Sequence, residues 1–95
     1  MSEFIQKVIN GFNKNLSGKE IDASFKFVFP EGTVFVDENG AREEDAPADC
    51  TLTMKSEVFT GLIKGEVNPA KAFMLGKIKV SGNVMKARKL GELLG

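Results

Sequence analysis

The amino-acid sequence predicts an α+β domain in which a mostly antiparallel sheet carries helices packed on one face. The first observation is that segments with helical periodicity alternate with segments whose apolar residues recur at every second position. The second is their order, which is helix, hairpin, edge strand, strand, two helices, strand and helix, without an internal repeat. The third is composition: 95 residues, 42% hydrophobic, with 13 basic and 13 acidic side chains, predict a single globular domain over residues 1–95 and exclude a disordered chain.

An amphipathic helix is expected over residues 2–16. Its apolar residues are spaced by one, three and four positions, which places them on one stripe: Phe4, Ile5, Val8, Ile9, Phe12 and Leu16. Ser17-Gly18 follows, and Gly readily takes the left-handed conformation in which many helices end. This stripe therefore predicts one helix face directed at a core.

A strand over residues 21–29 is predicted next, because Phe25, Phe27 and Phe29 share one face of an extended segment. Residues 30–32 supply turn chemistry, and the β-branched and aromatic run at 33–37 predicts the returning strand of a hairpin. Asn39-Gly40 is a second turn signal. The polar segment 41–47 is typical of a short edge strand that runs into a loop, where Pro47 lacks a ladder donor.

Residues 48–54 predict a strand with one apolar face, since Cys50, Leu52 and Met54 alternate with threonines. A helix should follow from an N-cap at Ser56 to about Lys64, with Gly65 ending it. A short second helix is expected before Gly76, with Asn68 as its cap and Pro69 at its first position.

The segment 77–81 alternates strictly between lysines and apolar residues, which predicts a half-buried strand. Asn83 is the expected cap of a final short helix that reaches residue 94. Its inner stripe is predicted to hold Val84, Ala87, Gly91 and Leu94.

The absent residue types argue against catalysis. The chain has no His, so it lacks an imidazole for a general base, a metal ligand or a Ser-His-Asp triad. The single cysteine, Cys50, has no partner for a disulfide or a zinc cluster and is expected to be a buried thiol. The glycines match no phosphate-binding motif, and the acidic residues lack the ligand spacing of an EF-hand. We therefore expect a protein that is not an enzyme and has no cofactor and no metal.

Four linked motifs carry a family resemblance. They occupy residues 48–54, 59–65, 68–73 and 76–83, and in order and register they resemble the sterol carrier protein type 2 (SCP2) family. The resemblance is strong over residues 48–90, whereas residues 21–45 match only as a strand pattern. It implies a five-stranded sheet with helices on one side and an apolar tunnel for a fatty acyl chain, acyl-CoA, phospholipid or sterol. It implies no reaction.

Two departures from the family pattern bear on location and on the tunnel. The segment before the first strand has room for one main helix, whereas many members carry a longer helical region there. The sequence also lacks the extra C-terminal segment of peroxisomal members, an S-K-L address and a signal-peptide pattern, and no apolar run approaches the ~20 residues of a transmembrane helix. A bacterial or archaeal cytoplasmic form is therefore expected.

The expected function is lipid binding and transfer, with the cargo held between sheet and helices. Burial of apolar surface contributes ~0.8 kcal/mol for each CH₂, so an acyl chain needs no catalytic group for affinity, and broad specificity follows. Taken alone, however, the phenylalanines and methionines are more typical of ordinary core packing. The residues expected to line the tunnel are Phe12, Phe27, Leu52, Met54, Phe59, Leu62, Ile63, Phe73, Met74, Ile78, Val80, Met85 and Leu90.

A non-catalytic scaffold or accessory protein for enzymes of polyprenyl-lipid or quinone biosynthesis is the alternative. Some bacterial members of the resembled family have this character. The sequence selects neither the head group of a cargo nor a sterol over a straight acyl chain, and it leaves the oligomeric state open.

The zero net charge conceals two opposed halves of the chain. Residues 31–49 hold seven acidic side chains against Arg42 alone, and residues 64–89 hold seven basic side chains against Glu66 alone. The basic half predicts either a solvated face or transient docking on anionic membranes. Nucleic acid is not an expected partner, because no stacking aromatics are interleaved with these bases.

Overall fold

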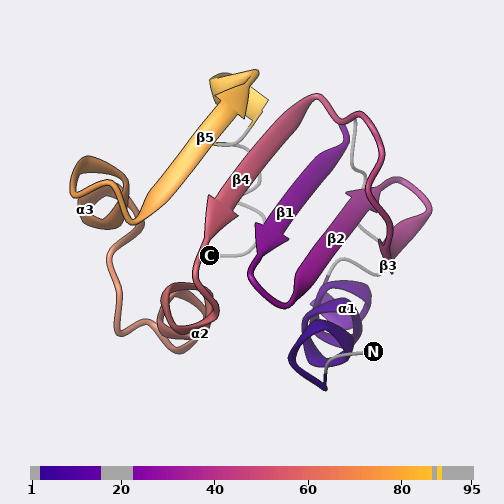
Figure 1. The fold of residues 1–95 in the computed structure, drawn as a ribbon, viewed down its shortest axis with the longest axis horizontal. Coiled ribbons are helices and arrows are strands. Elements are labelled where there is room, and N and C mark those ends of the chain that lie inside the picture. Colours follow the sequence, from indigo (N-terminus) through magenta and orange to yellow (C-terminus); the bar gives the residue numbers. More distant parts are fainter. Residues whose placement is uncertain (1–2, 16–22, 87, 89–95) are drawn as a thin grey trace.

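A five-stranded mixed sheet forms the centre of the molecule (Figure 1). The computed structural model describes residues 3–15, 23–86 and 88. The strand order is β3-β2-β1-β4-β5, and β1 pairs in parallel with β4 while the other neighbours are antiparallel. The predicted α+β class with a mostly antiparallel sheet is therefore confirmed. The strands are β1 (Phe25–Phe29), β2 (Gly32–Asp37), β3 (Gly40–Glu43), β4 (Cys50–Met54) and β5 (Ile78–Gly82).

The predicted starts of β1 and β4 are too early. Residues 23–24 and 48–49 lie outside β1 and β4, because Ser24 and Asp49 bond to each other across the strand starts. The backbone N–H of Ser24 donates to Asp49 Oδ2 at 3.0 Å, and the N–H of Asp49 donates to the Ser24 hydroxyl oxygen at 2.9 Å. The predicted edge strand ends at Glu43, and the chain then crosses to β4 without regular structure.

The helix α1 (Glu3–Asn15) buries Ile5, Val8, Ile9 and Phe12 of the predicted apolar stripe, with Phe4 partly buried, and packs against β2 and β3. Asn13 fixes its last turn to β3: the Ala41 N–H donates to Asn13 Oδ1 at 2.8 Å, and Asn13 Nδ2 donates to the Ala41 carbonyl at 3.3 Å. Residues 2 and 16, the ends of the predicted helix, lie outside the described residues.

Two further helices, α2 (Ser56–Lys64) and α3 (Pro69–Met74), connect β4 to β5. The prediction that Ser56 caps α2 is wrong, because Lys55 occupies the cap position and the Ser56 hydroxyl donates to Glu57 Oε1 at 3.0 Å. Gly65 ends α2 in the left-handed conformation with φ 76°, as predicted. The predicted Asn68 cap is also confirmed, since its side-chain oxygen accepts from the Lys71 N–H at 3.2 Å.

The predicted C-terminal helix is described only at its start. Residues 84–86 and 88 are helical, and the Asn83 side chain accepts from the Met85 N–H at 3.1 Å, as a cap does. The rest of the predicted helix, including Leu90, lies outside the described residues.

The core lies between the helices and one face of the sheet. Alternate residues of β1, β2, β4 and β5 point into it and meet α1, Phe59 of α2 and Ala72 of α3. Phe35 is buried on the opposite face, where the Arg42 guanidinium lies 4.8 Å from its ring centroid.

Candidate functional site

An apolar pocket of about 220 Å³ lies between α1 and α2. Its floor consists of the buried side chains Val8, Phe12 and Phe59. The exposed lining residues, Lys7, Ile63 and Lys64, therefore belong to its opening. The complete lining is Phe4, Lys7, Val8, Gly11, Phe12, Phe59, Thr60, Ile63 and Lys64.

Phe59 is the centre of the aromatic cluster beneath this pocket. Its ring centroid lies 5.3 Å from that of Phe29, 5.7 Å from that of Phe12 and 5.9 Å from that of Phe27. Phe4 completes the set at 6.4 Å. Edge-to-face and tilted rings at these separations pack favourably, so α2 is attached to both the sheet and α1 through one side chain.

Gly11 keeps part of the pocket open. A Cβ atom built on this residue would meet no neighbouring atom within 4 Å, so the space beside the helix is free. Gly in a helix interior costs about 1 kcal/mol relative to Ala. The helix therefore gives up stability at a position where a side chain would occupy the pocket.

A wider groove of about 810 Å³ lies at the end of the sheet where β1 and β4 end and β5 begins. Its charged lining residues are Lys55, Lys77 and Lys79, together with one carboxylate, that of Glu57. The rest of its lining is Val28, Phe29, Pro30, Thr53, Met54, Val58 and Gly76.

The predicted lining residues are distributed over three environments. Phe12, Phe59 and Ile63 line the pocket between α1 and α2. Others lie in or against the core: Phe27, Leu52, Met54 and Ile78 are buried there, and Leu62 and Val80 are partly buried. Met54 also lines the wider groove. Phe73, Met74 and Met85 are exposed at 50%, 83% and 68% and line neither space.

Six pocket residues were not predicted from the sequence: Phe4, Lys7, Val8, Gly11, Thr60 and Lys64. The sequence does contain one signal for the pocket, because Gly11, beside Phe12 on an amphipathic helix, marks a position without a side chain. It does not reveal which element lies opposite this position, since nothing in the local pattern of either helix says that α1 faces α2.

Cys50 lies in neither space. Its side chain is buried in β4, and burial raises the pKa of the thiol, with a smaller contribution from the negative charge of Asp49. The thiol therefore stays protonated at neutral pH and behaves as a small apolar residue. Among the described helices, none has the length and apolar character to cross a bilayer.

Comparisons with known proteins agree with this architecture. A family model described as the SCP-2 sterol transfer family matches residues 3–95. Sterol carrier protein 2 of Bos taurus is 33% identical over 111 residues, covering 90% of this chain and 20% of the relative. The chain thus spans about one fifth of the length of that relative.

Two solved structures show the same fold. The solution structure of sterol carrier protein 2 from Aedes aegypti in complex with palmitate is 20% identical, with a TM-score of 0.79 and coverage of 100% of this chain and 97% of that one. The ubiquinone synthesis protein UbiJ-SCP2 is 13% identical, with a TM-score of 0.71 and coverage of 95% and 87%. The four linked motifs, the five-stranded sheet and the family match lead to one conclusion: the chain belongs to the SCP-2 sterol transfer family.

Proposed function

We propose that this domain binds the acyl chain of a fatty acid or acyl-CoA in the pocket between α1 and α2, and carries it as a lipid-transfer protein. The observation that carries the proposal is a pocket with a buried aromatic and aliphatic floor and two lysines, Lys7 and Lys64, at its opening. An acyl chain would displace water from the floor, and the ammonium groups would remain near a carboxylate or phosphate. The palmitate complex of the Aedes aegypti relative supports the same ligand class.

The small volume of the pocket implies that α1 and α2 move apart when a long ligand binds. Pockets for small molecules usually measure about 300–1,000 Å³, whereas this one measures about 220 Å³. A long acyl chain would therefore have to separate α1 from α2, and a phospholipid or a sterol-like ligand would require a larger separation.

Gly11 offers a direct test with its own control. Gly11→Leu places a side chain in the free space beside α1, whereas Gly11→Ala adds only a methyl group. We expect Gly11→Leu to weaken binding of a fluorescent acyl probe about tenfold or more and to melt no lower than the parent, because Leu is a good helix former. Gly11→Ala should melt higher and bind with near-parental affinity. Parental affinity in Gly11→Leu, or the absence of both a probe signal and a thermal shift in the parent, would reject the proposal.

We propose further that residues 1–95 act as a single domain in the cytoplasm and that binding involves no reaction, cofactor or metal. The absence of His from the sequence and the buried, protonated thiol of Cys50 support a binding role.

A scaffold for enzymes of polyprenyl-lipid or quinone synthesis is the second candidate. The fold shared with UbiJ-SCP2 and the exposed apolar residues of α3 favour it. A carrier purified from cells releases lipid on organic extraction, whereas a scaffold is isolated with a defined set of enzymes and without lipid.

A further inference from the structure

Three consecutive large apolar residues are exposed where α3 ends. Phe73, Met74 and Leu75, here termed the α3 tip, are exposed at 50%, 83% and 67%. The helix is attached to the core through Ala72, which is 2% exposed. A cluster of exposed apolar side chains on a folded domain marks a contact surface, because leaving it in water is unfavourable.

Three lysines flank this tip. Lys71 lies on α3, and Lys77 and Lys79 follow it into β5; all three are exposed. Within the described part of the chain, no carboxylate forms an ion pair with any of the three. The nearest acidic residue in sequence is Glu66, in the loop before α3. Lys77 and Lys79 also line the groove of about 810 Å³ beside the tip, with Lys55 and Glu57.

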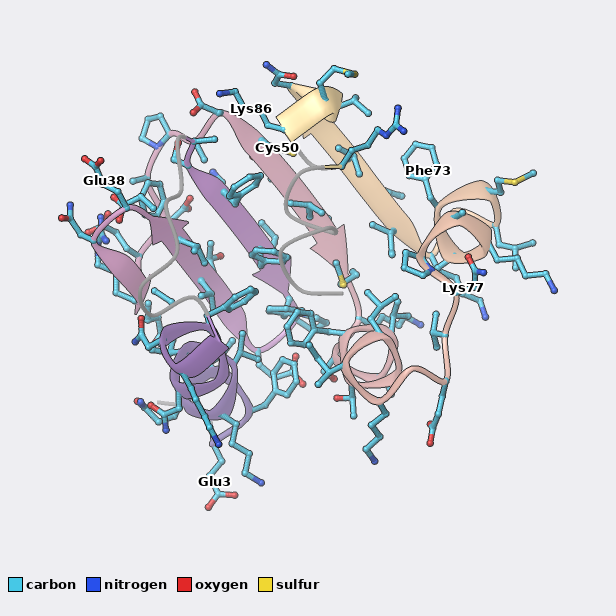
Figure 2. The ribbon with its side chains drawn as sticks, turned by 180° about the vertical axis from the view of Figure 1, so that it is seen from behind. Glu3, Glu38, Cys50, Phe73, Lys77 and Lys86 are labelled. Atoms are coloured by element: carbon cyan, nitrogen blue, oxygen red, sulfur yellow. The ribbon has the colours of Figure 1, made fainter. Side chains whose placement is uncertain are left out.

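A cluster of acidic side chains lies at the opposite edge of the sheet, and two acidic residues, Glu57 and Glu66, lie near the tip. Figure 2 shows Glu38, in the turn between β2 and β3, near the β3 edge of the sheet, whereas Phe73 and Lys77 lie by the opposite, β5 edge. Glu43 and Glu44 extend the acidic edge along and beyond β3. The domain is therefore polarised, with the exposed apolar cluster at its basic end.

We propose that the α3 tip inserts into the headgroup layer of an anionic bilayer, with the flanking lysines among the lipid phosphates. An apolar tip surrounded by lysines is the composition that binds such an interface, because apolar burial and attraction to anionic lipid act together. A second copy docked tip to tip would bring the same lysines against one another, which charge repulsion opposes. The acidic edge would face away from the membrane, and the groove beside the tip would receive a lipid headgroup. Docking does not require the proposed cargo pocket, so the two proposals can fail separately.

Co-sedimentation of the full chain with vesicles tests this surface. We would compare neutral phosphatidylcholine vesicles with vesicles that also contain phosphatidylglycerol, at low and at high salt. The parent should bind the anionic vesicles at low salt, and the binding should weaken as salt screens the charges. Met74→Ser/Leu75→Ser should reduce the partition constant about tenfold, because both side chains lose apolar contact.

Matched controls separate the tip from the rest of the surface. Lys71→Gln should weaken binding about fivefold at low salt. Lys14→Gln also removes one positive charge, but from the last turn of α1, which Asn13 joins to β3 and which lies away from the tip. It should change binding less than twofold. Val84→Ser, at a residue 51% exposed beyond the far end of β5, is the apolar control and should also have little effect.

Several outcomes would overturn the assignment: equal binding to neutral and anionic vesicles, parental binding by the tip variant, or equal losses in the controls. A parent that sediments as a dimer, with a monomeric tip variant, would identify a second copy as the occupant. Loss of soluble acyl-probe binding in the tip variant would instead return Met74 to the predicted cargo lining and overturn the docking assignment.

Discussion

Individual side chains decide what the space between α1 and α2 can hold. Phe59 contacts four other phenylalanines and closes the floor, while Gly11 leaves the wall open. The phenylalanine alternation in β1 was predictable, because a period of two places Phe25, Phe27 and Phe29 on one face, and all three are buried. That Phe12 and Phe59 form the pocket floor while these three rings lie in the core was not predictable, because it depends on which helices lie above the sheet.

The lysine at the end of α2 should recognise the acidic end of the cargo. Lys64→Gln is expected to weaken palmitate binding about threefold and to leave hexadecanol binding unchanged, because only the acid carries a charge. Displacement of a fluorescent acyl probe by each ligand measures both affinities. Lys14→Gln, outside the pocket, serves as the control, and an equal loss for the acid and the alcohol would contradict a charge contact.

A second prediction concerns the pair formed by Asp37 and Arg42. The two guanidinium nitrogens each donate to one carboxylate oxygen at 3.2 Å, and this bonding lowers the pKa of Asp37, assisted by the Asn39 N–H. The pair therefore contributes stability fully above the ordinary Asp pKa of about 4, and this contribution is lost as pH falls below that value.

Melting temperatures across pH test this pair. Asp37→Asn should melt slightly below the parent at pH 7, and the difference should vanish towards pH 2. Glu38→Gln, in the same turn, should match the parent at both values. A difference between parent and Asp37→Asn that persists in acid would show that the effect is independent of charge.

At the scale of helices and strands, the local patterns predicted nearly every segment of the described chain. Periodicity and caps were sufficient for α1 and α3, and alternation was sufficient for β5. The cap of α2 was misplaced by one residue because Ser56 bonds to Glu57 instead of to the backbone. The parallel pairing of β1 with β4 was not predictable, because strand order depends on the crossover after β3 and leaves no mark on the strands themselves.

The register of β5 gives a prediction at this scale. Val80 pairs with Leu52 and packs against the core, whereas its neighbour Ser81 is exposed. Val80→Asp places a carboxylate in this apolar environment and should lower the free energy of unfolding by about 2 kcal/mol, whereas Ser81→Asp should change it by less than about 0.5 kcal/mol. Urea denaturation measures both, and equal stabilities would show that Val80 faces solvent.

At the scale of the whole molecule, the fold places the two proposed functions on different sides. The pocket is lined by α1 and α2, and the exposed apolar tip belongs to α3. In the ribbon, α3 lies beside β5, away from α1 (Figure 1). The sequence predicted the family and the opposed charges, because both are recorded in consecutive residues. It did not predict that Phe73 and Met74 lie outside the pocket, since their apolar character is the same in either place.

Contacts between bound palmitate and the protein test the central claim, which is that the acyl chain lies between α1 and α2. Isotope-filtered nuclear Overhauser measurements with labelled protein and unlabelled palmitate detect these contacts directly. We expect cross-peaks from the chain methylenes to Val8, Phe12, Phe59 and Ile63. Bound palmitate whose cross-peaks reach only residues outside this pocket, such as Val80 or Met85, would contradict the account.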